Sequence, residues 1–404
     1  MLENWLLLLF VCSTNTTATR PGVPAGAKYD ERLNEAAHMG IPENIPGSGE
    51  VAGGAYAAFW AWFRQHEATF FKVVQQHENV ETAFFDPMAE KLGDAGHGFY
   101  FLTGMADEHT AELVVSAEGL IRNIPFVEDL VAAAPAITGW KFTALKPAFD
   151  MSGASIRMQG YEFSKETIHF YANEHEDFPD LIDITVVNDD LTDENRQLVG
   201  NGTYTFIDNC IGELNFATNI DYLNIVGRQQ ATQELIPIEK LGDYLVWRQK
   251  EFVEKYEAAR RDTAQDRYAM LEATLQNGNP LLAVINTDLL EWDGKASHPW
   301  ILEIAIPYPG ADNSGMPDMP TCQLLDAFED DLLQHLKDED GYLNIGRQTA
   351  ENVREIYLAC RDFRTPPRVL HALQQQYAGK LQVQYDMYKD KYWRSFNRFR
   401  NTEY

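Results

Sequence analysis

Two histidines stand close together in the stretch HFYANEHED, which begins at residue 169. In an extended strand alternate side chains point to the same side, so His169 and His175 would share one face with Tyr171 and Asn173. Two imidazoles and a carboxylate could bind a transition metal. The neighbouring glutamates, however, would alternate to the other face or fall at the strand end. We therefore interpret the two histidines as exposed strand positions and predict neither a metal nor another cofactor.

A second group of polar residues belongs to a helix in the last third of the chain. Apolar side chains repeat at helical spacing between Leu325 and Leu336, which indicates a buried face. The rest of this helix carries the carboxylates of Asp326, Glu329, Asp330 and Asp331. We interpret the pair Glu329 and Asp330 as part of a solvated face. We predict that Asp326, Asp330 and Asp331 belong to a surface that meets a partner.

Sequence motifs of common enzymes are missing. The chain has no GxxxxGK[ST] phosphate loop, no GxGxxG, no GxSxG elbow and no HExxH helix. A nucleophile and base scattered along the chain would leave no such trace, so the sequence does not decide whether the protein is an enzyme. A non-catalytic protein is favoured. The alternative is a carboxylate-dependent hydrolase with its site in a cleft between the two halves.

The charge of the chain is strongly negative. Its 404 residues include 33 basic and 61 acidic side chains, a net charge of −28. Such a surface repels nucleic acids and anionic membranes, whose binding depends on lysine and arginine. It attracts a basic protein, although solubility alone would also explain it. Residues 301–350 carry 10 acidic and 2 basic side chains, so the predicted acidic helix lies in one of the most negative segments.

The cysteines and the first residues bear on the compartment. Four cysteines at positions 12, 210, 322 and 360 form no CxxC pair, and Cys210 and Cys360 lie in apolar patterns that indicate buried thiols. A reducing cytoplasm is favoured. The apolar run at 5–12 is too short to span a bilayer and lacks a basic flank, so a secreted or lipid-anchored protein is less expected. A signal, an extension and a mis-set start all remain open for residues 1–20.

Hydrophobic periodicity predicts an α+β protein with two α/β-sandwich units. Aromatic residues between Tyr56 and Val74 recur at helical spacing, which favours a buried helix face over a ligand site. Beyond them the pattern reads β-β-α-β-β-β-α-β. The predicted divisions are a disordered or linker-like arm at 1–55, an N-terminal α+β domain at 56–230, a helical bridge at 231–265 and a C-terminal domain at 266–404.

The C-terminal domain has the clearest pattern. Two apolar runs at 268–275 and 281–286 flank the turn sequence QNGNP and predict a hairpin. The elements that follow read β-α-β-β-α-β, which is the ferredoxin-like order. We therefore predict a ferredoxin-like unit with an added N-terminal hairpin. Within it, Gly346 is expected to permit a tight or bulged backbone and Arg347 to pair with a carboxylate.

Residues 268–395 resemble the family called Domain of Unknown Function 695. The resemblance rests on HPWILEIAIPYPGADNSGMPD, AFEDDLLQHLK, IGRQTAENVREIYLACRD and YKDKYW. Residues 57–226 look like a region that accompanies this domain in some bacterial proteins. The resemblance implies no activity, substrate or cofactor. It does suggest four residues for a shared surface, namely Arg347, Thr349, Asp362 and Trp393, although the favoured interpretation of these residues is structural, as a salt bridge and a core edge.

Taken together, these observations favour an acidic interaction or regulatory protein of the cytoplasm. We expect it to be non-catalytic and to bind a basic protein partner. We expect no binding of nucleic acid and no association with a membrane.

Overall fold

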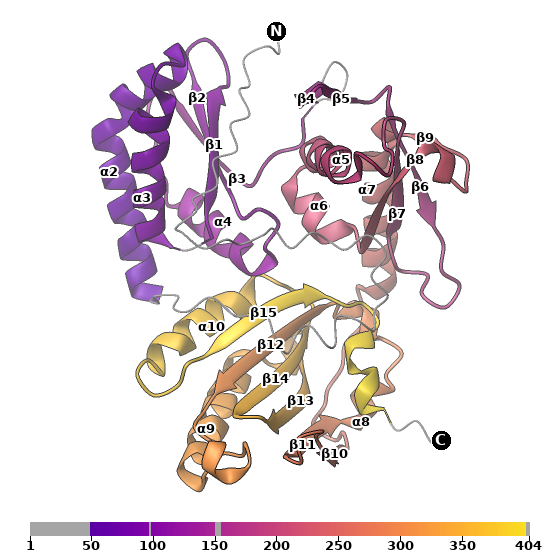
Figure 1. Cartoon of the computed structure of the whole chain (residues 1–404). Helices are drawn as coiled ribbons and strands as arrows, with labels where there is room; N and C mark the ends of the chain where they lie inside the picture. The colour runs from indigo at the N-terminus through magenta and orange to yellow at the C-terminus, as the bar shows by residue number, and fades with distance from the viewer. Residues whose placement is uncertain (1–48, 97, 150–154, 401–404) are drawn as a thin grey trace. The chain divides into compact units, whose positions relative to one another are not determined.

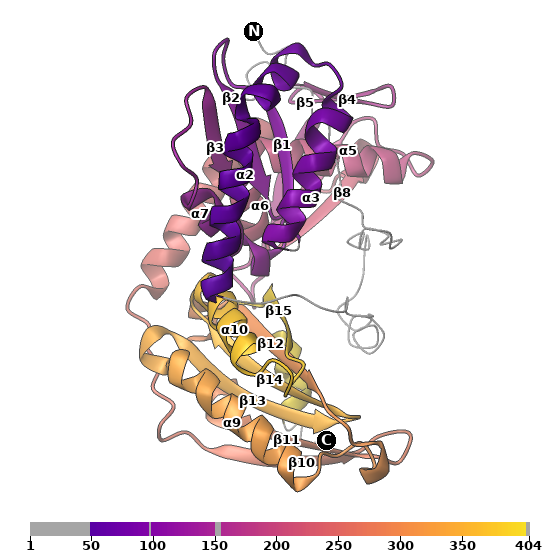
Figure 2. The same ribbon diagram turned by 90° about the vertical axis from the view of Figure 1, so that its left-hand side faces the viewer.

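The computed structural model describes residues 49–96, 98–149 and 155–400 and contains both helices and sheets (Figures 1 and 2). The predicted α+β class is confirmed. The chain forms two compact units: among the described residues, unit 1 contains Gly53–Leu120 and Val127–Gln249, and unit 2 contains 49–52, Ile121–Phe126 and the chain from Lys250 onward. The predicted arm falls mostly outside the described residues, and the predicted domain bounds stay predictions.

The first helix of the described chain, α2 (Gly49–Gln76), buries its aromatic stripe. Phe59, Trp60, Phe63, Phe70 and Val74 are each at most 3% exposed, so the predicted buried face is confirmed. Some of the aromatic rings meet edge to face, for example those of Phe59 and Trp60, whose centroids lie 4.9 Å apart. A π-helical turn (Glu81–Phe85) and α3 (Asp86–Ala95) follow and add Phe84 to the same core.

A three-stranded sheet completes this part of unit 1. It consists of β1 (Tyr100–Met105), β2 (Ala111–Ser116) and β3 (Trp140–Ala144). The first two strands form the predicted antiparallel hairpin, and β3 runs parallel to β2. A parallel neighbour requires a crossover, which here includes the helix α4 (Ile124–Ala132).

A second sheet in unit 1 has the strand order β8-β7-β6-β9. Its strands are β6 (Ile168–Asn173), β7 (Asp183–Asn188), β8 (Tyr222–Gly227) and β9 (Ile236–Pro237). A short separate hairpin is formed by β4 (Ser155–Met158) and β5 (Tyr161–Ser164). The helices of this part are α5 (Arg196–Ile211), α6 (Glu213–Asn219) and α7 (Leu241–Tyr256).

Gly202 shows why α5 tolerates a poor helix former. A Cβ atom at this position would lie 2.1 Å from the ring of Phe163. Glycine destabilises a helix interior by up to about 1 kcal/mol relative to alanine. Here it allows the helix to approach the β5 side chain closely, which no larger residue would permit.

A buried carboxylate links distant backbone segments of unit 1. Glu213, at the start of α6, is 1% exposed. Its Oε1 accepts hydrogen bonds from the backbone N–H groups of Ala117 at 2.9 Å and Gly119 at 3.1 Å. Its Oε2 accepts one from the N–H of Lys146 at 3.0 Å. A carboxylate with three donors is well compensated for its loss of water.

The side chain of Lys146 forms ion pairs beside this carboxylate. Its Nζ lies 2.5 Å from Oδ2 of Asp208 and 3.2 Å from Oε1 of Glu118. Burial lowers the pKa of Lys146, but the carboxylates of Asp208 and Glu118 outweigh that effect and raise the pKa above its ordinary value. The ammonium group therefore stays charged inside the fold.

Unit 2 contains one six-stranded antiparallel sheet in the order β10-β11-β13-β14-β12-β15. The strands are β10 (Tyr268–Thr274), β11 (Pro280–Asn286), β12 (Trp300–Pro307), β13 (Tyr342–Ala350), β14 (Val353–Cys360) and β15 (Gln384–Lys389). The helices are α8 (Thr287–Leu290), α9 (Met319–His335) and α10 (Thr365–Gln376). The predicted hairpin and the predicted order of elements after it are confirmed.

The two faces of this sheet are covered differently. α9 and α10 lie on one face, where Leu325, Phe328 and Leu332 of α9 are fully buried (Figure 2). The opposite face packs against a second apolar core that includes Tyr357, Trp393 and residues of the C-terminal 3-10 helix Arg394–Phe399. α9 can therefore present polar side chains over this face of the sheet.

The described cysteines are free thiols, and Cys210 and Cys360 are buried as predicted. Burial raises the pKa of the Cys210 thiol to about 12. Of the helices in the described ranges, none is both long enough and apolar enough to cross a bilayer.

Candidate functional site

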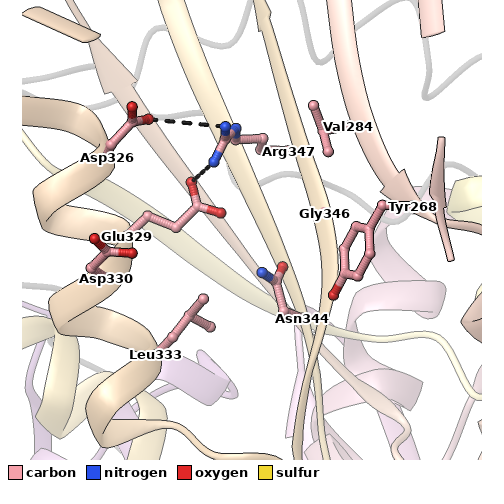
Figure 3. A pocket seen from close by; sticks show the side chains of 9 residues that line it. All are labelled: Tyr268, Val284, Asp326, Glu329, Asp330, Leu333, Asn344, Gly346 and Arg347. Atoms are coloured by element: carbon pink, nitrogen blue, oxygen red, sulfur yellow. Dashed lines mark hydrogen bonds and ion pairs between the residues drawn. The ribbon is translucent and has the colours of Figure 1, made fainter. Parts of the chain in front are cut away.

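A pocket of about 440 Å³ lies in unit 2 between α9 and the sheet (Figure 3). Its walls come from α9 on one side and from β10, β11 and β13 on the other. The lining residues are Tyr268, Val284, Asp326, Glu329, Asp330, Leu333, Asn344, Gly346 and Arg347. Three of them, Asp326, Asp330 and Arg347, are among the residues predicted for a partner surface. We call this the α9 pocket.

The helix α9 supplies the carboxylates because of their spacing. Asp326, Glu329, Asp330 and Leu333 are three, four and seven residues apart along the helix, so they form one stripe beside the buried apolar face. The start of the helix is fixed by Asp318, whose Oδ1 accepts a hydrogen bond from the N–H of Thr321 at 2.9 Å. The cap and the apolar face together hold the stripe towards the sheet.

A β-bulge in β13 turns Arg347 towards the helix. The pairing of β13 with β14 shifts between Asn344 and Gly346, which confirms the predicted bulged backbone. Gly346 has a φ of 141°, and a Cβ atom there would lie 2.2 Å from the carbonyl oxygen of Val284. Only glycine fits, and the extra residue places both Asn344 and Arg347 on the face that α9 covers.

Ion pairs fill one end of the α9 pocket. Arg347 donates from Nη1 to Oε2 of Glu329 at 2.7 Å, and its Nη2 lies 4.0 Å from Oδ1 of Asp326. Asp326 also accepts from Nη1 of Arg354 at 2.6 Å. The prediction that Arg347 pairs with a carboxylate is confirmed. Asp330, in contrast, has no ion-pair partner among the described residues.

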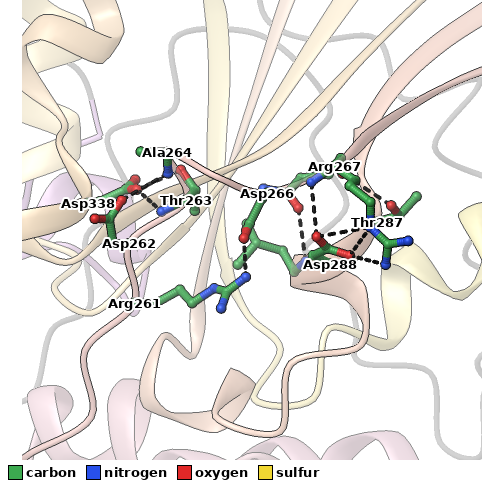
Figure 4. A network of polar contacts seen from close by, with 11 residues as sticks. Arg261, Asp262, Thr263, Ala264, Asp266, Arg267, Thr287, Asp288 and Asp338 are labelled. Carbon is green, nitrogen blue, oxygen red and sulfur yellow. Dashed lines mark hydrogen bonds and ion pairs between the residues drawn. The ribbon is translucent and has the colours of Figure 1, made fainter.

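The tyrosine wall of the pocket is held by the segment before β10 (Figure 4). The backbone N–H and the hydroxyl of Thr263 both donate to Oδ2 of Asp338, at 2.7 and 2.6 Å. Arg267 donates from Nη2 to Asp288 at 2.6 Å and from its backbone N–H at 3.0 Å. These contacts fix the entry to the strand, and with it the position of Tyr268, whose side chain is partly exposed.

The chemistry of the α9 pocket suits a cationic group. Three carboxylates meet two arginines, because Arg354 beside the pocket also binds Asp326, so a net negative charge remains. Tyr268 adds an aromatic ring, and Oδ1 of Asn344 is a buried acceptor without a donor among the described residues. A lysine ammonium or arginine guanidinium can bind carboxylates and an aromatic face at once. None of the lining residues is a serine, cysteine or histidine, which would be the usual nucleophiles or bases.

The other predicted surface residues serve the fold. Oδ2 of Asp331 accepts from Nε2 of Gln376 and from the hydroxyl of Tyr377, each at 2.7 Å, and so ties α9 to the end of α10. Oδ2 of Asp362 accepts from the N–H of Thr365 at 2.8 Å at the start of α10. Neither residue lines the pocket.

Two of the predicted surface residues are buried, which corrects their assignment to a surface. Thr349 is 6% exposed, and its hydroxyl accepts from Nε of Arg354 at 3.2 Å. Trp393 is 2% exposed and donates from Nε1 to the carbonyl of His298 at 2.9 Å. Their side chains fill the interior of unit 2, so neither can meet a partner.

The two histidines that were considered as metal ligands belong to no cluster of metal-binding side chains in the described structure. Nε2 of His175 is 2.7 Å from Oδ2 of Asp183, whereas Nδ1 of His169 is buried without a hydrogen bond in the described structure. Among the described residues, no group of three or more histidine, cysteine, aspartate or glutamate side chains could hold a metal ion.

Sequence reasoning missed the role of Glu329. It was expected on a solvated face, but it is 6% exposed and bound to Arg347. Tyr268 was also missed, because one aromatic residue at the start of a strand carries no signal of its own.

A further polar residue, Glu303, lies on the opposite face of the sheet. Its cross-strand partner on β14 is Tyr357, which belongs to the second apolar core. Burial, together with the nearby carboxylate of Glu355, raises the pKa of Glu303 to about 7.

Of the comparisons with known proteins, only a family model matches, and it covers the C-terminal part of the chain. No curated protein and no solved structure matches the chain. The region expected to accompany the C-terminal domain stays a prediction. The resemblance of the C-terminal part is confirmed: residues 272–399, which contain every lining residue of the α9 pocket except Tyr268, match the model of DUF695, a family of unknown function.

Proposed function

We propose that this protein is a non-catalytic interaction protein that binds a basic protein partner through the α9 pocket. One observation carries the proposal. The pocket gathers three carboxylates, and the two arginines that bind them, Arg347 and Arg354, pair with Glu329 and Asp326, so Asp330 is left without an ion-pair partner among the described residues. A lysine or arginine of the partner would supply the missing positive charge.

Electrostatics would act at two ranges. The net charge of −28 would attract a basic partner over distances comparable to the Debye length, which is about 8 Å at 0.15 M salt. Inside the pocket, Asp330 and Asp326 would accept hydrogen bonds from the cation while Tyr268 contacts its apolar stem. Long-range attraction mainly raises the association rate, and the buried pair mainly slows dissociation.

A catalytic role receives less support from the pocket. The lining offers carboxylates that are held by arginines and no serine, cysteine or histidine. The alternative of a carboxylate-dependent hydrolase with a site in a cleft between the two halves stays a prediction.

The proposal includes two finer assignments. The first is that residues 300–389 form a ferredoxin-like fold. The strand order β13-β14-β12-β15, with α9 after β12 and α10 after β14, favours it, because both helices then connect parallel strands separated by one strand. The second is a cytoplasmic location, which the free thiols of Cys210 and Cys360 favour.

The experiment compares charge variants of Asp330 as baits. Wild-type protein, Asp330→Asn and Asp330→Lys are immobilised, and proteins retained from a lysate of the source cells are identified by mass spectrometry. Asp312→Asn is the matched control, because it removes one exposed carboxylate outside the pocket. Binding kinetics of each retained protein are then measured at low and at physiological salt.

We expect a basic protein that wild type and the Asp312 variant retain alike. Asp330→Asn should weaken its binding about tenfold, or about 1.4 kcal/mol, and Asp330→Lys more strongly. The association rate should fall as salt rises. A partner that binds all four baits with one affinity would contradict the proposal.

A further inference from the structure

The strand that carries Tyr268 is the edge of its sheet. β10 pairs with β11 on one side and is the terminal strand of the order β10-β11-β13-β14-β12-β15. An edge strand presents a row of backbone N–H and C=O groups that another chain can pair with. Here that row begins beside the α9 pocket, because Tyr268 belongs to both.

The register identifies which backbone groups face outward. Antiparallel strands alternate between hydrogen-bonded and non-hydrogen-bonded pairs. The N–H of Thr287 donates to the carbonyl of Arg267 at 3.0 Å, and the N–H of Leu275 donates to the carbonyl of Asn279 at 2.8 Å. Both hydrogen bonds show that the backbone groups of the odd-numbered residues of β10 pair with β11. The N–H and C=O groups of Tyr268, Met270 and Glu272 therefore point to the open edge.

The side chains of the same residues share a face with the pocket. Met270 lies opposite Val284, which in turn lies opposite Arg347, so one row of side chains runs from the edge of the sheet to the ion pairs beneath α9. Met270 is 69% exposed and Tyr268 is 46% exposed. Glu272, also exposed, adds a carboxylate to this edge. The edge thus offers apolar contact and negative charge together.

We propose that the partner binds as an extended basic segment that adds a strand to β10 and places one lysine or arginine in the α9 pocket. This inference rests on the proposed function and states the form of the partner. An added strand would lie about 4.8 Å from β10. Its alternate side chains would point to the pocket side, where a long basic side chain would pass Met270 towards the carboxylates of α9.

The negative charge of the exposed residues indicates which kind of chain would bind at this edge. A basic segment meets Glu272 at the edge and Asp326 and Asp330 in the pocket, so the carboxylates along its path outnumber the one exposed arginine of the pocket lining, Arg347. A second copy of the chain would instead bring another net charge of −28 to the same edge. Like charges facing each other across paired strands destabilise the pairing.

The test uses a fluorescein-labelled synthetic peptide of ten residues in which arginine and threonine alternate. Its binding to the full chain is followed by fluorescence anisotropy at 0.15 M salt. Met270→Pro removes an outward N–H without touching the bonds between β10 and β11, because proline is tolerated on the open side of an edge strand. Met270→Ala is the matched control, since it keeps the N–H and removes the side chain.

We expect Met270→Pro to weaken peptide binding at least tenfold and Met270→Ala to weaken it less than threefold. Two further peptides are N-methylated at alternate residues, one at the arginines and the other at the threonines, so each loses the N–H groups along one of its two edges. The peptide whose methyl groups face β10 should bind wild-type protein at least tenfold more weakly. The methylated peptide requires no variant of the protein, so it decides the question even if Met270→Pro disturbs the fold.

The outcomes separate this inference from the proposed function. Weakening by Asp330→Asn, with full binding by Met270→Pro and by both methylated peptides, would overturn strand addition and leave the pocket proposal standing. Unchanged binding in all variants would overturn both. A wild-type dimer in sedimentation velocity that Met270→Pro dissociates, together with no peptide binding, would assign the edge to a second copy and overturn the inference.

Discussion

Two buried glutamates, Glu213 in unit 1 and Glu329 in unit 2, meet different surroundings. Glu213 is 1% exposed and accepts three backbone N–H groups, all from its own unit. Glu329 is 6% exposed and is bound by Arg347, whose side chain is 32% exposed. The carboxylate of Glu213 is enclosed by backbone donors, whereas that of Glu329 lines a pocket that is open to solvent. Burial alone does not distinguish them, whereas the identity and exposure of the donors do.

The largest effect is expected from Glu213→Ala. The change leaves three backbone donors without their acceptor and removes a carboxylate near the ammonium of Lys146, and breaking such a buried charged contact costs about 3–5 kcal/mol in the free energy of unfolding. The measurement is hydrogen exchange of the β2 amides over a urea series. Glu108→Ala, an exposed loop change in the same unit, should stay within about 0.5 kcal/mol. If both variants lowered the free energy of unfolding equally, Glu213 would be no more important for stability than an exposed residue, and its contrast with Glu329 would be lost.

Glu303 extends the comparison, because the surroundings of its partly buried carboxyl group favour the neutral form over the ionised form. Its pKa rises from the ordinary value of 4.5 to about 7 in the folded protein. The folded state therefore binds the proton more tightly than the unfolded state, so the free energy of unfolding should fall as pH rises from about 4.5 to about 7 and then level off. The expected loss is about 3 kcal/mol, because each unit of pKa shift corresponds to about 1.4 kcal/mol.

The check on Glu303 is the difference between wild type and Glu303→Gln across that pH range, measured by hydrogen exchange of β12 amides. Other titrating groups affect both proteins alike and cancel. The glutamine variant should gain stability relative to wild type as pH rises. A difference that stays constant from pH 4.5 to 7.5 would show that the carboxyl titrates normally.

The smallest effect is expected from Glu329→Gln. The amide oxygen still accepts the hydrogen bond from Arg347, and the open side of the pocket lets water reach the guanidinium. The cost in unfolding free energy should be about 1 kcal/mol. Urea-dependent exchange of the β13 amides measures it. A loss as large as that of Glu213→Ala would mean that the pocket is part of the structural core.

Periodicity predicted the elements more fully than the site. The aromatic stripe of α2 and the alternation in β12 repeat over many residues, so a buried face was visible in each. The hairpin of β4 and β5 was missed because four-residue strands give too few repeats to stand out from a loop. The bulge at Gly346 was predicted, since a glycine inside a strand pattern indicates a local break in pairing.

The burial of Glu329 could not be read from the helix pattern. A glutamate beside the apolar stripe looks solvated when only the four strands of the β-α-β-β-α-β unit are considered. The added hairpin widens the sheet beyond β13, and the bulge turns Arg347 under the helix, so this flank of α9 faces protein instead of water. Both causes act between segments distant in sequence, where periodicity gives no information.

The hydrogen bonds of Glu213 also constrain the order in which unit 1 can form. They join residues separated by 67, 94 and 96 positions in the chain. Closing such long loops is entropically unfavourable, so we expect these contacts to form after the local ones. We therefore expect the three-stranded sheet and the sheet around β7 to become joined late in folding. A nascent chain that has not yet emerged as far as residue 213 should hold its first sheet loosely, with the amides after β2 still open to exchange.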